Sequence, residues 1–250
     1  MNILITGATS GIGKSLVEFY AQAGHSIFAC GRNPEKLSQL SEYGNVSGVC
    51  FDVIDYSETK TQLSQLPAID LAILNAGDCE YIKDASEFDA ALFQRLININ
   101  LVSLGYQIEA LVPKLQQSVG QAQLVLMGSS ASMLPLPQAE AYGASKAGLA
   151  YLADTLYLDL KNHGIDVSRI SPGFIETPLT DRNHFSMPFI MSSEDAVKRI
   201  AKGIAKRKVH IAFPNRLIWT LKLFNMLPLT WWQKLITPKS SERSESPSGS

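Results

Sequence analysis

The feature that most constrains this chain is a regular alternation of short apolar runs with longer amphipathic runs. A short apolar run suits a strand buried on both faces, whereas apolar residues at every third or fourth position suit a helix. Crossover helices between such strands give a parallel sheet that is covered by helices on both faces. We therefore expect one α/β domain, with a doubly wound parallel sheet of about seven strands.

The alternation defines the expected elements and their limits. The expected strands are Asn2–Thr6, Ser26–Cys30, Val46–Val53, Ile69–Leu74, Gln123–Met127, Ile165–Ile170 and Val209–Phe213. Two long helices are expected, at about Glu87–Gln117 and about Glu140–Asn162. No linker interrupts residues 1–214, which form the expected dinucleotide-binding and catalytic domain. Residues 215–236 are an apolar, aromatic extension broken by Pro228, and the serine-rich residues 237–250 are expected to be disordered.

Composition narrows the class of protein. Apolar residues make up 46% of the chain and charged residues 18%, so a large core is expected and global disorder is not. The net charge of −1 argues against a dedicated nucleic-acid surface. Neither the three isolated cysteines nor the four scattered histidines have ligand spacing, so no metal site is expected. With no signal peptide or membrane span visible, we expect a reducing, cytoplasmic compartment.

A glycine-rich turn joins the first strand to the first helix. Backbone N–H groups in such a turn can bind a pyrophosphate at the helix N-terminus. By itself the turn could be an ordinary strand-to-helix connection, but its place at the start of a βαβ unit favours dinucleotide binding. Its residues are Thr6, Gly7, Ala8, Thr9, Ser10, Gly11, Ile12 and Gly13.

The end of the second strand indicates which dinucleotide is bound. An NAD site usually has an acidic residue here to hold the ribose 2′-hydroxyl. This chain has Arg32 instead, and no acidic residue precedes Glu35. A guanidinium suits a 2′-phosphate. We therefore predict NADP(H) in preference to NAD(H), with a solvated turn arginine as the alternative.

Tyr142 and Lys146 are four residues apart in an expected helix, so they share a face. An ammonium beside a phenol favours the phenolate and lowers the pKa of the phenol toward a range useful for proton transfer. The residues between them are small, which would let a flat ligand approach the helix. On its own, the pair could also arise by chance.

Together these motifs resemble the short-chain dehydrogenase/reductase family in its compact form, over roughly residues 1–180. The resemblance implies a Rossmann-like fold that transfers a hydride between nicotinamide and a carbonyl or alcohol substrate. It also implies cofactor contacts near the adenine, after the fourth strand and in a loop that holds the nicotinamide carboxamide. These residues are Asp52 and Val53, then Asn75, Ala76 and Gly77, then Pro172, Gly173, Ile175 and Thr177. The chain departs from the family in having Leu74 before Asn75 and Ser10 before Gly11.

The resemblance assigns catalysis to four residues, namely Ser129, Tyr142, Lys146 and Asn100. Ser129 would polarise the substrate carbonyl, and the adjacent Ser130 stays an alternative. Tyr142 would deliver the proton. Lys146 would lower the pKa of Tyr142 and bind the nicotinamide ribose, while Asn100 would hold a water that links Lys146 to solvent.

Two other classes of function use similar motifs. A non-catalytic dinucleotide sensor or scaffold could share the fold, although it would not need all four catalytic residues. A sugar-nucleotide epimerase also uses a tyrosine and a lysine at this spacing, but it usually has a larger substrate domain than this chain can hold. The family resemblance further implies a homodimer or homotetramer formed through the two long helices.

Two segments bear on the substrate and on partners. The loop Thr180–Met191 contains Phe185, Met187 and Phe189, and it is predicted to form an apolar lid, with plain packing as the alternative. Residues 215–236 either form a cap that packs on the cleft or on a partner subunit, or lie at a membrane surface. Tryptophan and leucine with flanking lysines are typical of interfacial segments.

Overall fold

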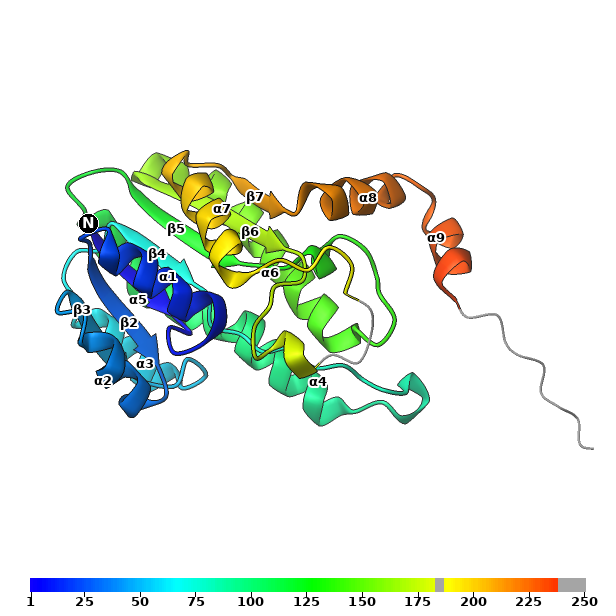
Figure 1. Cartoon of the computed structure of the whole chain (residues 1–250), viewed down its shortest axis with the longest axis horizontal. Coiled ribbons are helices and arrows are strands. Elements are labelled where there is room, and N and C mark those ends of the chain that lie inside the picture. The colour runs from blue at the N-terminus through cyan, green and yellow to red at the C-terminus, as the bar shows by residue number, and fades with distance from the viewer. Residues whose placement is uncertain (183–186, 238–250) are drawn as a thin grey trace, which may run out of the picture.

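The computed structural model describes residues 1–182 and 187–237. Within these residues, seven strands form one parallel sheet in the order β3-β2-β1-β4-β5-β6-β7 (Figure 1). Since β1 and β4 are neighbours, the chain runs outward from the centre of the sheet in both halves. This switch point leaves a crevice at the carboxyl ends of the strands, where such folds bind ligands. The strands are β1 (Asn2–Thr6), β2 (Ser26–Gly31), β3 (Val46–Cys50), β4 (Leu71–Leu74), β5 (Ala122–Met127), β6 (Ile165–Pro172) and β7 (His210–Phe213).

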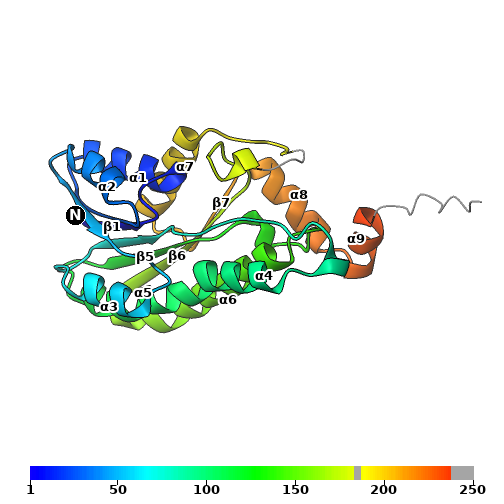
Figure 2. The ribbon, with the colours of Figure 1, turned by 90° about the horizontal axis from the view of Figure 1, so that it is seen from below.

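Helices cover both faces of the sheet, which confirms the expected α/β fold (Figure 2). Alternate residues of a strand point to opposite faces, so Ile5 of β1 belongs to one apolar core and Leu4 to the other. One face carries α1 (Gly11–Gln22), α2 (Pro34–Ser41) and α7 (Ser193–Ala205). The other carries α3 (Tyr56–Ser64), α5 (Ser103–Gln116) and α6 (Glu140–Leu160).

The expected strand Val46–Val53 was too long. β3 ends at Cys50, and the backbone N–H of Asp52 donates to the Glu58 carboxylate at 3.1 Å instead of to a neighbouring strand. Asp52 and Val53 therefore lie in the turn that leads into α3.

The expected helix Glu87–Gln117 is wrong as one continuous element. α4 (Ala90–Ile97) begins after Asp89, whose side chain accepts a hydrogen bond from the Leu92 N–H at 2.8 Å. A π-helical turn, Asn98–Val102, then separates α4 from α5. Such turns are frequent at functional sites because the extra residue redirects a side chain. Here it presents Asn100 toward the segment after β4.

The aromatic extension folds as two helices, α8 (Asn215–Asn225) and α9 (Leu229–Ile236), with the break at Pro228. Figures 1 and 2 show both helices projecting from the body beyond β7. The indole N–H of Trp232 donates to the Pro135 carbonyl at 2.8 Å, which ties α9 to the segment before α6. No helix among residues 1–182 and 187–237 is both long and apolar enough to cross a bilayer. The tail predicted to be disordered lies outside the described residues, apart from Thr237.

Candidate active site

A pocket of about 380 Å³ lies where the strands end, at the switch point of the sheet. Most of the residues predicted to bind a cofactor or to act in catalysis line it, although they come from six separate parts of the chain. They are Gly7, Ser10, Gly11, Ile12, Arg32, Asn75, Ala76, Gly77, Ser129, Tyr142, Lys146, Pro172, Gly173, Ile175 and Thr177. Five further predicted residues, Thr6, Gly13, Asp52, Val53 and Asn100, lie outside the lining.

The glycine turn leaves the N-terminus of α1 open toward this pocket. Gly7 and Gly11 have φ angles of 65° and 49°, in the left-handed region that suits glycine. A Cβ at Gly7 would lie 2.9 Å from the Ala76 Cα, so a side chain would not fit. Ser10 precedes α1 without a side-chain cap, and the first turn contains no acidic residue. Uncapped N–H groups at a helix N-terminus fit a phosphate, so the turn suits a dinucleotide.

Two of the residues outside the lining hold the wall in place. The Thr6 hydroxyl accepts hydrogen bonds from the N–H groups of Asn75 and Ala76, at 3.1 and 3.2 Å. The Asn75 side chain donates to the Thr6 carbonyl at 3.1 Å. Gly13 lies against the turn, and a Cβ there would lie 2.1 Å from the Gly7 carbonyl oxygen. Thr6 and Gly13 thus support the turns instead of facing the pocket.

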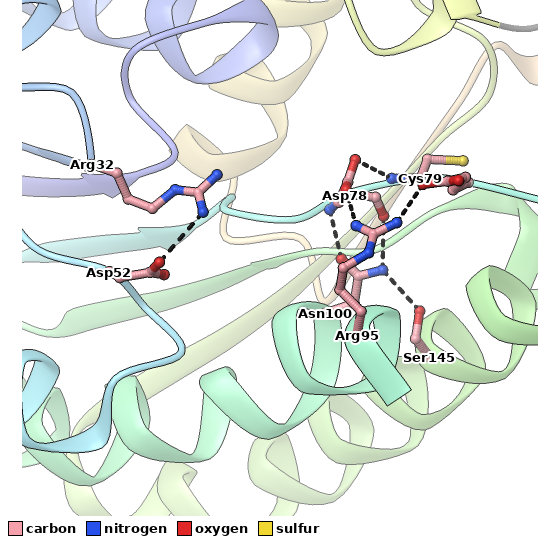
Figure 3. A network of polar contacts seen from close by, with 8 residues as sticks. Arg32, Asp52, Asp78, Cys79, Arg95, Asn100 and Ser145 are labelled. Atoms are coloured by element: carbon pink, nitrogen blue, oxygen red, sulfur yellow. Dashed lines mark hydrogen bonds and ion pairs between the residues drawn. The ribbon is translucent and has the colours of Figure 1, made fainter. Parts of the chain in front are cut away.

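Arg32 lies at the outer end of the pocket, where the ribose-binding residue was expected. Its guanidinium is 3.3 Å from the Asp52 carboxylate, and the Arg32 side chain is 67% exposed (Figure 3). Exposed ion pairs contribute little to stability, so Arg32 can exchange this partner for another anion at small cost. Val53 is buried behind this end.

Ser129 follows β5 and lines the pocket together with Tyr142. The Ser129 oxygen accepts the Ala131 N–H at 3.1 Å, which orients the side chain. Ser130 begins the short 3₁₀ helix Ser130–Ser132 and is not among the residues that line the pocket. Of the two serines, Ser129 lines the pocket with Tyr142 and Ser130 does not.

Lys146 is buried below Tyr142. Its ammonium donates to the Met127 carbonyl at 2.9 Å and lies 5.8 Å from the centre of the Tyr142 ring. Burial disfavours the charged form and lowers the pKa of Lys146 to about 8. A Cβ at Gly77 would lie 2.8 Å from the Asn100 Oδ1 and 3.5 Å from the lysine nitrogen, so glycine leaves room for both groups.

Burial raises the pKa of the Tyr142 phenol above its ordinary value, and the interaction with Ser129 opposes this only in part. Tyr142 is consequently a protonated acid across the neutral range. The Lys146 ammonium is directed at the Met127 carbonyl. The expected lowering of the Tyr142 pKa by Lys146 stays a prediction.

Asn100 is buried, and its amide is fully engaged (Figure 3). Its Nδ2 donates to the Asp78 carbonyl at 2.8 Å and to the Ser145 hydroxyl at 3.0 Å, while its Oδ1 accepts the Asp78 N–H at 2.9 Å. Ser145 in turn donates to the Tyr142 carbonyl at 2.7 Å. Asn100 thus links the π-helical turn, the segment after β4 and the catalytic helix α6.

Sequence reasoning missed several lining residues. The Asp78 carboxylate is bound by Arg95 at 2.6 Å, and the same guanidinium binds Glu80. Adjacency was the available signal, because Asp78 directly follows the Asn75-Ala76-Gly77 motif and Gly128 directly precedes Ser129. The missed residues are Asp78, Ile99, Met127, Gly128, Pro178 and Leu179.

The expected lid is supported only at its first residue. Thr180 lines the pocket, whereas the Phe189 and Ile190 side chains are exposed and are not among the lining residues. Phe185 lies outside the described residues. Among the described residues, no group of three or more His, Cys, Asp or Glu side chains could hold a metal ion.

Comparison with known proteins gives concordant matches. A family model described as short chain dehydrogenase matches residues 1–186. An uncharacterized oxidoreductase of Myxococcus xanthus is 30% identical, covering 90% of this chain and 92% of the relative. Sulfoacetaldehyde reductase 2 of Chromohalobacter salexigens is 32% identical, covering 71% of this chain and 74% of the relative. A solved short-chain dehydrogenase from Sphingobium yanoikuyae in complex with NADPH is 25% identical, with a TM-score of 0.79 over 98% of each chain.

Proposed function

This chain belongs to the short-chain dehydrogenase/reductase family, and we propose that it transfers a hydride between NADP(H) and an apolar carbonyl or alcohol substrate. The oxidoreductase class follows from the family, whose related members are named dehydrogenases and reductases. The observation that carries the proposal is that Ser129, Tyr142 and Lys146 line the same pocket as the glycine turn.

The residues at the outer end of the pocket support a dinucleotide with a 2′-phosphate. The uncapped N-terminus of α1 would hold the pyrophosphate, and Arg32 would hold the 2′-phosphate in exchange for Asp52. No acidic residue stands at the position of Arg32 to hold a free 2′-hydroxyl. The solved relative from Sphingobium yanoikuyae binds NADPH, which agrees with this assignment. NAD(H) is the less favoured alternative.

The catalytic residues divide the proton chemistry among them. The bound cofactor supplies or accepts the hydride. Ser129 donates a hydrogen bond to the substrate oxygen, and Tyr142 donates its proton to that oxygen as negative charge develops there. The Lys146 ammonium stabilises the tyrosinate that results, since it lies against the same ring. In alcohol oxidation Tyr142 takes the proton back.

Asn100 supports the catalytic residues through hydrogen bonds to Asp78 and Ser145. In this structure its amide is held by Asp78 and Ser145, so it fixes the position of the segment after β4 relative to α6. The family role of holding a water beside Lys146 stays a prediction. A sensor or scaffold function is not favoured by any of the described residues.

The lining beyond Tyr142 supports an apolar substrate. Ile99, Pro178 and Leu179 contribute apolar surface to the pocket, beside the polar catalytic groups. We expect the side chain of the substrate to lie against these residues.

We further propose a homodimer or homotetramer formed through α5 and α6. Tyr151 and Leu158 of α6 are 79% and 70% exposed, although both are large and apolar. Residues of this kind are usually covered when they lie on one helix face. A cytoplasmic location stays a prediction that rests on the free cysteines.

The test is consumption of NADPH and of NADH with a panel of aldehydes and ketones that ranges from small charged to large apolar compounds. We expect a lower KM for NADPH than for NADH, and higher kcat/KM for the apolar carbonyls. A preference for NADH would contradict the role of Arg32, and a preference for small charged carbonyls would contradict the role of the apolar lining.

A further inference from the structure

The helices α8 and α9 carry an unusually exposed set of large apolar side chains. Trp219 and Leu223 of α8 are 71% and 64% exposed, and Met226, the residue after α8, is 83% exposed. Trp231 and Leu235 of α9 are each 63% exposed. Soluble surfaces rarely gather so many large apolar groups in so short a segment. We call these five residues the C-terminal apolar surface.

The spacing of these residues forms one stripe on each helix. Trp219, Leu223 and Met226 follow one another at intervals of four and three residues, so they share a face of α8. Trp231 and Leu235 are likewise four residues apart on α9. Other faces hold the helices to the body, through the buried Leu217 and Ile218 of α8 and the buried Trp232 of α9.

Positive charge flanks both stripes. At 100° per residue, Arg216 and Lys222 lie on either side of the α8 stripe, and Lys234 lies beside the α9 stripe. The Lys222 ammonium is 5.5 Å from the centre of the Trp219 ring, so this cation lies directly on the apolar surface. None of the three cations forms an ion pair with another described residue.

The charge pattern decides between the partners that could cover this surface. The sequence contains no aspartate or glutamate from Ala196 to Ser241, so every charged side chain of the extension is a cation. A symmetric contact between two copies would bring like patches, and so like charges, together. An anionic bilayer instead neutralises the cations while its acyl region receives tryptophan and leucine side chains.

We propose that the C-terminal apolar surface docks on a membrane whose lipid headgroups are anionic, with α8 and α9 lying in the interface. This goes beyond the proposed oxidoreductase function and does not depend on it. The helix α8 is fixed to the rim of the catalytic pocket, because Leu217 lies against Gly173, and α9 is hydrogen-bonded to Pro135 in the segment before α6. Docking therefore places the lipid surface beside the pocket.

Tryptophan fluorescence tests this directly, since Trp219, Trp231 and Trp232 are the three tryptophans of the chain. The full chain is titrated with vesicles of phosphatidylglycerol and, in parallel, of phosphatidylcholine. We expect a blue shift of the emission with phosphatidylglycerol, at least tenfold weaker binding to phosphatidylcholine, and weaker binding at high salt. Absence of a blue shift with phosphatidylglycerol overturns the proposal.

Variants separate the apolar contribution from the charge, with sedimentation on vesicles as the readout. Leu223→Ser with Leu235→Ser should lower affinity for phosphatidylglycerol vesicles at least tenfold, and Lys222→Gln with Lys234→Gln should remove most of the preference for that lipid. Val119→Ser is the matched control, because Val119 is fully exposed far from this surface and its loss should change nothing.

Equal vesicle binding by the Leu223→Ser, Leu235→Ser variant and the unchanged chain contradicts the proposal. A lower oligomer mass of this variant, measured by light scattering without lipid, also contradicts it, because a second copy of the chain would then cover the C-terminal apolar surface. No substrate or cofactor is present in these measurements, so their failure is distinct from failure of the proposed oxidoreductase activity.

Discussion

Two arginine–aspartate pairs lie at separate ends of the pocket, which Arg32 and Asp78 line (Figure 3). At the outer end, Arg32 and Asp52 are 3.3 Å apart and their side chains are 67% and 30% exposed. At the catalytic end, Arg95 and Asp78 are 2.6 Å apart, and the Asp78 backbone is hydrogen-bonded on both sides by the buried Asn100. The Arg32–Asp52 pair is therefore an isolated, exposed contact, whereas the Arg95–Asp78 pair is connected to the buried Asn100.

The difference indicates a division of labour. An exposed ion pair is screened by water and exchanges partners easily, which suits a group that must bind a phosphate of the cofactor. The buried Asn100 amide has no water to replace its hydrogen bonds, so each lost contact is costly and the geometry around it stays fixed. Fixed geometry suits proton transfer, because small displacements of the reacting groups reduce the rate strongly.

The largest expected effect belongs to Tyr142→Phe at the catalytic end. Removal of a general acid typically costs about 10²- to 10⁴-fold in rate, and no other phenol replaces it here. We expect kcat to fall by this factor while the affinity for NADPH, measured by fluorescence titration, stays within about twofold. Tyr81→Phe is the matched control, since its ring lies 6.4 Å from that of Tyr142 and it has no assigned role.

Asn100→Ala should lower both stability and activity. The change leaves the Asp78 N–H and carbonyl without their partner in a buried site, at a cost of about 1–3 kcal/mol in the free energy of unfolding. Urea unfolding measures this cost. Asn98→Ala in the same π-helical turn is the control, because Asn98 is exposed. Similar losses in both variants would refute the role given to the buried amide.

The pH dependence of carbonyl reduction should report Lys146. Since burial lowers the pKa of Lys146 to about 8, the ammonium is lost as pH rises through that value. Tyr142 stays protonated there, because its pKa is raised. We expect kcat/KM to fall about tenfold per pH unit above this pKa. In Lys146→Arg, any residual activity should no longer fall as pH rises through this value, because the guanidinium keeps its charge. An unchanged fall in kcat/KM would show that another group titrates.

The smallest effect is expected for Arg32→Ala at the outer end. Loss of one exposed, charge-assisted contact should raise the KM for NADPH by about tenfold and leave the KM for NADH unchanged. Stability should change by less than about 0.5 kcal/mol, since the ion pair to Asp52 is exposed. Lys36→Ala, an exposed cation on α2, serves as the control. Equal rises in KM for both cofactors would count against recognition of the 2′-phosphate.

The sheet and most of the residues that line the pocket could be predicted from the sequence. Strands such as Asn2–Thr6 have an apolar centre, here Ile3–Ile5, and the motifs at their ends converge once the sheet is parallel. The π-helical turn at Asn98–Val102 was not predictable, because apolar periodicity continues through it and the turn depends on hydrogen bonds of Asn100 to distant residues. The raised pKa of Tyr142 likewise comes from burial by the folded chain.

The central claim is that catalysis and cofactor choice reside at separate ends of one pocket. A double-variant cycle of Tyr142→Phe and Arg32→Ala tests it most directly, with kcat/KM for NADPH-dependent carbonyl reduction as the measurement. The account predicts that the two losses add as free energies to within about 0.5 kcal/mol, as for independent sites. A coupling energy well above about 1 kcal/mol, or a loss of kcat in Arg32→Ala comparable with that in Tyr142→Phe, would contradict it.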